Sequence, residues 1–143
     1  MTNSPKHTVF YTIEKAIKEY RKFAFKRIQN TFNDITLDQA LLIQFLHENP
    51  SLSQNQIAKL IFKDNASVTR MIELMVNNKY LKRSVDKNDR RKHKIELTDK
   101  AKCSIEEMNN IIRSNRIAAQ KGIDSNDIES MNQTLNKIIE NCK

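Results

Sequence analysis

The sequence predicts a mainly α-helical protein of a single domain with one small β-hairpin. Its 143 residues include one glycine and two prolines, which are too few for a turn-rich β-sandwich and favour long helices. Apolar residues recur at steps of three and four along several segments, and this is the period of a helix. Apolar and polar residues alternate at 80–85 and 95–97, on the two sides of one short turn. Such alternation is typical of half-buried strands.

The N-terminal part predicts one long helix. Residues 1–7 are polar and are expected to be frayed. From about Val9 to Asn30 the apolar residues form one stripe, consisting of Ile13, Ile17, Tyr20, Ala24 and Ile28. Phenylalanines beside the stripe widen the apolar surface. The helix therefore needs several packing partners, and a second chain is a candidate for one of them.

Two shorter helices are predicted next. The first spans about 37–47, and its apolar run 40–46 is expected to be fully buried before Pro50 breaks the pattern. Ser53 and Gln56 have the spacing of a capping box. They begin a short helix in which four side chains are expected to face the core, those of Ile57, Ala58, Leu60 and Ile61.

A further helix is predicted over about 66–78, capped by Asp64 or Asn65. It buries Val68, Ile72 and Met75 and keeps a polar face near its start. Two short helices joined by a tight connector and followed by a hairpin are typical of a winged helix-turn-helix.

The hairpin is the most basic part of the chain. Its turn carries five cations, Lys87, Arg90, Arg91, Lys92 and Lys94. A protruding basic hairpin can reach a phosphate backbone or a narrow groove, and arginine suits the groove better than lysine. The alternative is a solvated hairpin without a partner, because charge runs are common on protein surfaces.

Two helices are predicted after the hairpin. Thr98 is expected to cap a long helix to about Gln120, and Gly122 to end it in a left-handed conformation. Ser125 is expected to cap the last helix, whose inward stripe is Ile128, Met131, Leu135 and Ile138 or Ile139.

The charge of the chain indicates a polyanionic partner. The formal net charge is +8, and the basic excess lies in the first half and in the hairpin, because acids and cations balance from Asp99 onward. Such an uneven distribution is typical of an electrostatic footprint on nucleic acid.

These features predict contacts with double-stranded DNA from the helix and the hairpin. An α-helix fits the major groove with its first residues at the base edges, and the planar fork of Arg70 suits guanine or a phosphate. The candidate contacts are Asn65, Ser67, Thr69 and Arg70 in the helix and Arg90, Arg91 and Lys92 in the hairpin. Alternatively, the helix positions are ordinary exposed polar residues.

Asp89 is unexpected on a turn that meets an anion. We interpret it as an organiser that holds Arg91 or a cation of a helix in place. The alternative is an ordinary turn residue, because aspartate favours turns.

Several classes of function find no support in the sequence. No nucleophile is paired with a base, no glycine-rich loop suits a phosphate, and no group of histidines, cysteines and carboxylates has metal-ligand spacing. We therefore expect no enzyme, no metal and no cofactor. No apolar run reaches the length of a membrane span, so we expect a cytosolic protein without a membrane partner. Cys103 and Cys142 are expected to be free thiols.

The motifs resemble those of the multiple-antibiotic-resistance regulator (MarR) family. Asp89-Arg90-Arg91 followed by Ile95-Glu96-Leu97-Thr98 resembles the wing signature of that family. Ile35-Thr36-Leu37-Asp38-Gln39 resembles the entry to its second helix, and Ala66-Ser67-Val68-Thr69-Arg70-Met71-Ile72 its recognition helix. The chain departs from the family at Asn78-Lys79-Tyr80, where a glycine is usual before the first wing strand.

The resemblance implies a homodimer. Residues 1–34 and 99–143 would form dimerisation helices around the winged helix-turn-helix region 35–98. The dimerisation residues would include Ile13, Ile17, Ile128, Met131 and Leu135. The resemblance also implies a palindromic operator and repression relieved by a small aromatic or phenolic ligand. Candidate ligand residues near the dimer junction are Tyr11, Tyr20, Phe23 and His47, each of which can instead belong to the core or the interface.

The function predicted from these observations is sequence-specific DNA binding by a transcription regulator, most simply a ligand-responsive repressor acting as a homodimer. The alternative is a winged-helix module that binds another protein, such as an antirepressor without its own operator.

Overall fold

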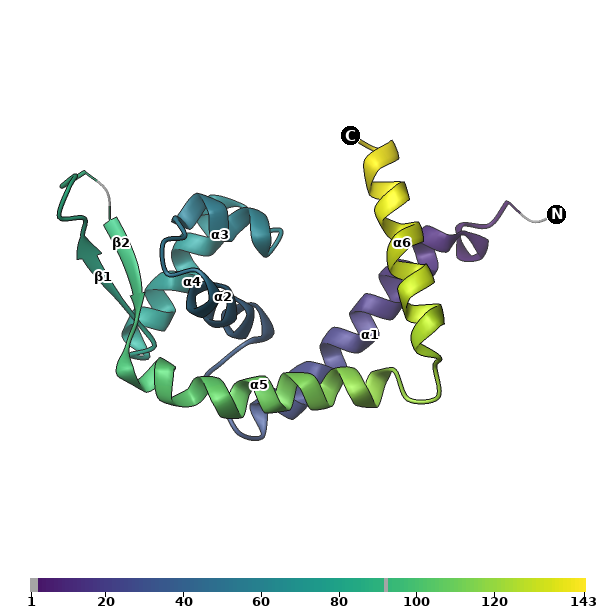
Figure 1. The fold of residues 1–143 in the computed structure, drawn as a ribbon, viewed down its shortest axis with the longest axis horizontal. Helices are drawn as coiled ribbons and strands as arrows, with labels where there is room; N and C mark the ends of the chain where they lie inside the picture. The colour runs from purple at the N-terminus through teal and green to yellow at the C-terminus, as the bar shows by residue number, and fades with distance from the viewer. Residues whose placement is uncertain (1–2, 92) are drawn as a thin grey trace.

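The computed structural model describes residues 3–91 and 93–143. Its winged helix-turn-helix lies at one side, and the other side is an arm formed by three helices (Figure 1). The elements in chain order are a 3-10 turn Pro5–His7, α1 (Val9–Gln29), α2 (Leu37–Glu48), α3 (Gln54–Leu60), α4 (Asn65–Asn77), β1 (Leu81–Val85), β2 (His93–Leu97), α5 (Asp99–Ala119) and α6 (Ser125–Asn141). This confirms the mainly helical fold with one hairpin.

The long helices α1 and α5 connect the two sides. They pack on each other where α1 ends and α5 passes beneath it, and α6 then turns back at the end opposite the hairpin (Figure 1). The 3-10 turn before α1 and the C-terminal end of α6 lie on the arm, far from the hairpin (Figure 1). No helix among the described residues is long and apolar enough to cross a membrane.

Side-chain caps determine where the helices begin. Capping boxes of Thr36 with Gln39 and of Ser53 with Gln56 start α2 and α3, and Thr98 caps α5. The expected cap of α6 was wrong by one residue. Asp124 takes that position because its backbone is extended and its carboxylate accepts the N–H of Asn126 at 2.8 Å. An extended residue with a short acceptor side chain is what the cap requires, and Ser125 is already helical.

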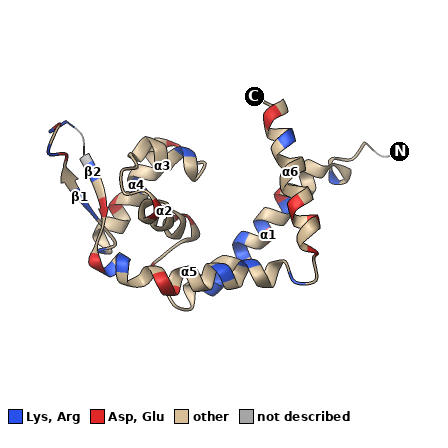
Figure 2. Ribbon diagram, in the orientation of Figure 1, with Lys and Arg blue, Asp and Glu red and all other residues tan. Residues whose placement is uncertain are grey.

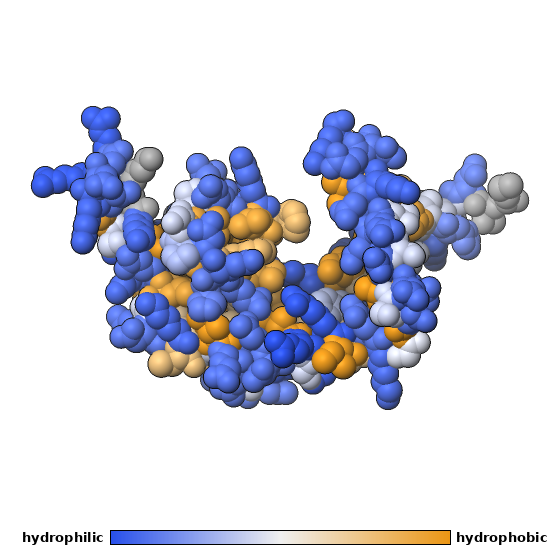
Figure 3. Space-filling view, in the orientation of Figure 1, coloured by the Kyte–Doolittle hydropathy of each residue, from blue (hydrophilic) through white to orange (hydrophobic). Residues whose placement is uncertain are grey.

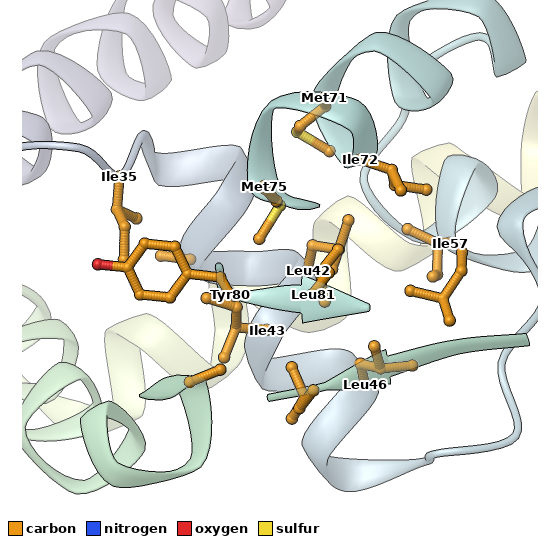
Figure 4. Packing of buried hydrophobic residues seen from close by; sticks show 14 of the residues in the cluster. Ile35, Leu42, Ile43, Leu46, Ile57, Met71, Ile72, Met75, Tyr80 and Leu81 are labelled. Atoms are coloured by element: carbon orange, nitrogen blue, oxygen red, sulfur yellow. The ribbon is translucent and has the colours of Figure 1, made fainter. Parts of the chain in front are cut away.

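The core is formed by the winged helix-turn-helix and the inner parts of α1 and α5. Its side chains come from α1, α2, α3, α4, β1, β2, α5 and the segments between them, and almost all atoms of the side chains in Figure 4 are carbon. The fully buried members include Ile28, Ile35, Leu42, Ile43, Leu46, Ile57, Ile72, Met75, Leu81 and Met108. The run 40–46 is buried less completely than predicted, because Leu41 and Phe45 are half-buried and line a cavity beside α1.

The hairpin is anchored at its base and exposed at its tip. The two strands pair in an antiparallel register that places Leu81 opposite Leu97 and Lys82 opposite Glu96. Leu81, Ile95 and Leu97 are buried in the core, whereas the turn extends away from the body of the molecule (Figure 1).

The turn between α4 and β1 contains a left-handed lysine. Lys79 has a φ of 68° and its N–H donates to the carbonyl of Val76 at 3.1 Å, while the N–H of Tyr80 donates to that of Met75 at 2.9 Å. These two bonds form a Schellman motif. Lys79, rather than Asn78, therefore takes the position at which the resembling family usually has glycine.

Candidate nucleic-acid interface

The start of α4 is fixed by Asp64. One carboxylate oxygen of Asp64 accepts the backbone N–H of Ser67 at 2.7 Å, and the other accepts its hydroxyl at 3.0 Å. The bond from the backbone N–H of Ser67 is the main cause that holds the pKa of Asp64 below its usual value, and the hydroxyl bond acts in the same direction. Asp64 therefore stays ionised at the positive end of the helix, and the hydroxyl proton of Ser67 is donated to its carboxylate.

Thr69 also uses its hydroxyl inside the molecule. Its Oγ1 donates to the carbonyl of Asn65 at 2.8 Å and accepts from Nε2 of Gln54 at 2.5 Å. The bond from Gln54 ties α3 to α4 and fixes the angle between the two helices. Sequence reasoning missed Gln54, since nothing in the spacing indicated which residue of α4 would face it.

Arg70 and Asn65 remain exposed near the start of the same helix. No ion pair is formed by Arg70 among the described residues. Of the four predicted contacts in α4, these two have side chains that project freely, whereas Ser67 and Thr69 are half-buried.

The tip of the hairpin is organised by aspartates. Asp86 accepts the N–H of Asn88 at 2.8 Å, and Asp89 accepts the N–H of Arg91 at 3.0 Å. Both bonds close a turn in the manner typical of aspartate. Asp89 thus serves as a turn residue, and it makes no ion pair within 3–91 and 93–143. The predicted hold of Asp89 on a cationic side chain stays a prediction.

The cations of the hairpin fall into two groups. Lys82 and Lys94 flank Glu96 at 3.7 and 3.4 Å near the base. Arg90 and Arg91 lie exposed in the turn, whose ribbon extends away from the body of the molecule and is partly blue for Lys and Arg (Figure 2). The predicted contact Lys92 lies outside the described residues.

A cavity of about 340 Å³ lies between α1, α2, α5 and the end of α3. Its walls are mostly apolar, and its polar members are Tyr20, Arg21, Asn115 and Arg116. Arg21 pairs with Asp38 at 2.8 Å. Asn115 is 1% exposed, and its Oδ1 has no hydrogen-bond partner. Sequence reasoning named Tyr20 but not Asn115 or Arg116, because residues so far apart in the chain meet only after folding.

The other candidate ligand residues lie elsewhere. Tyr11 and Phe23 are exposed on α1 outside this cavity. His47 lines a different cavity of about 270 Å³ behind the hairpin, next to Lys82, Lys94 and Lys102. The four residues therefore do not form one site within a single chain.

The predicted dimerisation residues are not buried within one chain. Ile17 and Met131 are exposed by 49% and 51%, and Ile13, Ile128 and Leu135 are half-buried. No residue of α6 is buried. Apolar surface therefore lies open along the arm, as the orange patches there show (Figure 3).

A helix-turn-helix made of α3 and the capped α4, followed by a basic hairpin, defines a winged helix-turn-helix protein. Residues 33–92, which include the helix-turn-helix and the first strand of the hairpin, match the model of the MarR family.

Solved structures share the fold over almost the whole chain. A Bordetella bronchiseptica protein, BpsR, described for the regulation of its DNA binding by 6-hydroxynicotinic acid, is 21% identical with a TM-score of 0.86 over 96% of this chain and 97% of its own. The Staphylococcus aureus protein MepR, solved with DNA, is 22% identical with a TM-score of 0.83 over 98% and 100%. A MarR regulator from Methanosarcina mazei is 20% identical with a TM-score of 0.77 over 93% and 94%.

Proposed function

We propose that this protein is a sequence-specific DNA-binding transcription regulator that represses as a homodimer and responds to a small ligand. The observation that carries the proposal is the pairing of a rigidly capped α4, with Arg70 and Asn65 free near its start, and an exposed arginine turn on the hairpin. Such a pair can read a major groove and the adjacent minor groove together.

The open apolar surface of the arm supports the homodimer. Large apolar side chains exposed along α1 and α6, and near the end of α5, include Phe10, Ile17, Ile117, Met131 and Ile139. Large apolar side chains that gather uncovered on one part of a molecule mark an interaction site. A second copy would cover it with the same residues and set two α4 helices against half-sites about one helical turn apart. In this arrangement residues 1–34 and 99–143 are dimerisation arms, and 35–98 is the DNA-binding region.

The cavity beside α1 supports the response to a ligand. It joins the arm to the helix-turn-helix, and its apolar walls with a few polar groups are typical of small-molecule sites. A ligand held there would contact both regions and could alter the placement of α4.

The first experiment is fluorescence-anisotropy binding to the DNA just upstream of the gene for this protein, with excess competitor DNA at two salt concentrations. Tight binding that resists competitor and falls steeply with salt is expected. Weak binding that competitor abolishes would contradict an operator at that site, and a selection from random sequences would then find the operator or favour the protein-binding alternative.

A further inference from the structure

The outward side of α4 is a ridge of four exposed residues. Val68, Ile72 and Met75 are buried on the opposite side, and Ile72 and Met75 lie among the packed core side chains in Figure 4. Because a helix has 3.6 residues per turn, the positions that face directly away from them are spaced by four, three and four residues. All four of these positions are exposed. They form the outer ridge of α4, which consists of Ala66, Arg70, Glu73 and Asn77.

Glu73 is the unexpected member of the outer ridge. The chain has a formal net charge of +8, and a helix that enters a groove of DNA faces a polyanion. A carboxylate there repels phosphate and reduces the affinity for DNA of any sequence. Glu73 also makes no ion pair in the part of the chain that the structure describes. Its charge is therefore not used to hold a described cation of its own chain.

Arg70 and Glu73 are placed to contact neighbouring base pairs. Residues three apart lie next to each other on one face of a helix. With a rise of 1.5 Å per residue, these two are separated by about 4.5 Å along the axis. Successive base pairs are separated by about 3.4 Å. When α4 lies along the major groove, the two side chains therefore point at base pairs one step apart.

The two side chains require different bases. The fork of arginine donates to O6 and N7 of guanine, whereas a carboxylate accepts from the N4 amino group of cytosine. Guanine and thymine offer no donor in the major groove. Adenine has one, but its N7 acceptor lies beside that donor and repels a second acceptor. A carboxylate at position 73 therefore favours cytosine over the other three bases.

We propose that Glu73 selects a cytosine at the base pair next to the guanine bound by Arg70, and that it weakens binding to other sequences. The inference rests on the proposed function, because it assigns the sequence preference of the same α4. Glu73 acts mainly by exclusion, since DNA without a donor at this position meets an uncompensated negative charge. A residue that lowers the affinity for random DNA thereby raises the ratio of specific to nonspecific binding.

The test is a selection from random DNA by the parent, by Glu73→Gln and by Glu73→Ala. Glutamine has nearly the same shape and pairs with adenine, whereas alanine has no acceptor, and both residues are good helix formers. Glu106→Gln is the matched control, because it removes one negative charge from an exposed position of α5. Anisotropy then measures affinity for the selected site, for that site with the cytosine replaced, and for random DNA.

We expect the parent and Glu106→Gln to select the same half-site, with a cytosine next to a guanine. At the cytosine position Glu73→Gln should select adenine, and Glu73→Ala should show no preference. Replacing that cytosine should weaken binding of the parent by about fivefold or more, and binding of Glu73→Ala by less than about twofold. Glu73→Gln and Glu73→Ala should both bind random DNA more tightly than the parent does.

Three outcomes overturn the inference and leave the proposed function intact. The first is a selected half-site without a cytosine beside a guanine. The second is selection of the same half-site by the parent and by Glu73→Gln. The third is an equal gain of affinity for selected and random DNA in Glu73→Ala, which would mean that Glu73 only repels the phosphate backbone. A parent protein that selects no sequence overturns the proposed function and this inference together.

Discussion

Polar side chains at the start of α4 divide into those used within the molecule and those left free. The hydroxyl of Ser67 bonds to the carboxylate of Asp64 at 3.0 Å. The hydroxyl of Thr69 donates to the carbonyl of Asn65 at 2.8 Å and accepts from Gln54 at 2.5 Å. A hydroxyl whose proton is already donated can only accept further bonds. Discrimination between base pairs should therefore depend more on Arg70 than on the two hydroxyl residues.

Arg70→Ala is expected to weaken binding to a specific site by about 1–3 kcal/mol and to relax the preference for that site.

Arg91→Ala should weaken binding to specific and random DNA alike. It should also reduce the dependence of affinity on salt concentration, because it removes a contact that neutralises phosphate. Anisotropy titrations at several salt concentrations measure both effects. Lys121→Ala, on the turn after α5, is the control for loss of one charge. Parent-like binding by both arginine variants would show that the interface lies elsewhere.

Tyr80 makes stability depend on pH in the alkaline range. Burial raises the pKa of Tyr80 to about 12, and its hydrogen bond to Asp34 at 2.8 Å adds to the shift. Because the folded pKa exceeds the ordinary value of about 10, the unfolded chain loses this proton first. The stabilisation is complete below pH 10 and is lost as the pH rises toward 12.

Tyr80→Phe should remove this alkaline decrease in the free energy of unfolding. It should also lower that free energy by about 0.5–1.5 kcal/mol at neutral pH, because the hydrogen bond to Asp34 is missing. Urea unfolding of parent and variant at pH 7, 9 and 11 measures both effects, and the difference between the two proteins cancels the titration of the lysines. An equal loss of unfolding free energy between pH 9 and 11 in the two proteins would contradict the assignment to Tyr80.

At the scale of elements, the ends of the helices control the geometry of the helix-turn-helix. Both α3 and α4 end in a left-handed residue that is not glycine, Phe62 and Lys79. Two Schellman turns thereby set the directions in which α4 and the hairpin leave their preceding helices. Phe62 lines the cavity beside α1, whereas Lys79 is exposed and lies away from it.

Lys79→Gly is therefore expected to stabilise the protein by about 0.5–1 kcal/mol, because relief of the left-handed strain exceeds the entropy that glycine gains in the unfolded chain. Lys102→Gly, in the interior of α5, should instead destabilise by about 1 kcal/mol. Midpoints of chemical denaturation compare the two variants with the parent. Destabilisation by Lys79→Gly would mean that the lysine side chain itself holds the turn.

At the scale of the whole molecule, the arm leaves apolar side chains uncovered in a single chain. α6 buries none of its residues, although its apolar stripe has the spacing of a packed helix. One chain therefore forms a packed helix-turn-helix and an arm whose apolar surface remains open (Figure 3).

Leu135→Glu should weaken the proposed dimer by on the order of 3 kcal/mol, since it would bury an unpaired charge. Lys137→Glu, two positions along on the other side of α6, adds the same residue and should leave the mass unchanged. Sedimentation across a range of concentrations measures the association, and operator affinity should fall together with it. A parent protein that is monomeric at all concentrations would contradict the homodimer.

Local signals made much of the fold predictable. The helices were located correctly from capping residues and from apolar residues spaced by three and four. The strands were located from the alternation of apolar and polar residues around the hairpin. Each of these signals acts over only a few residues. The cap of α6 was misplaced because Asp124 and Ser125 are both good caps and only the backbone decides between them. The predicted full burial of 40–46 failed at Leu41 and Phe45, because helix periodicity does not show that a neighbouring helix leaves a cavity.

The sequence by itself determined the class of fold, the family motifs and the basic hairpin, since these depend on residue type and short spacing. Only the tertiary structure decided which polar residues of α4 are free, that Lys79 takes the left-handed position, and that Phe62, Asn115 and Arg116 line one cavity. The reason is physical: hydrogen bonds such as that of Gln54 to Thr69, and cavities between helices, depend on how distant segments pack.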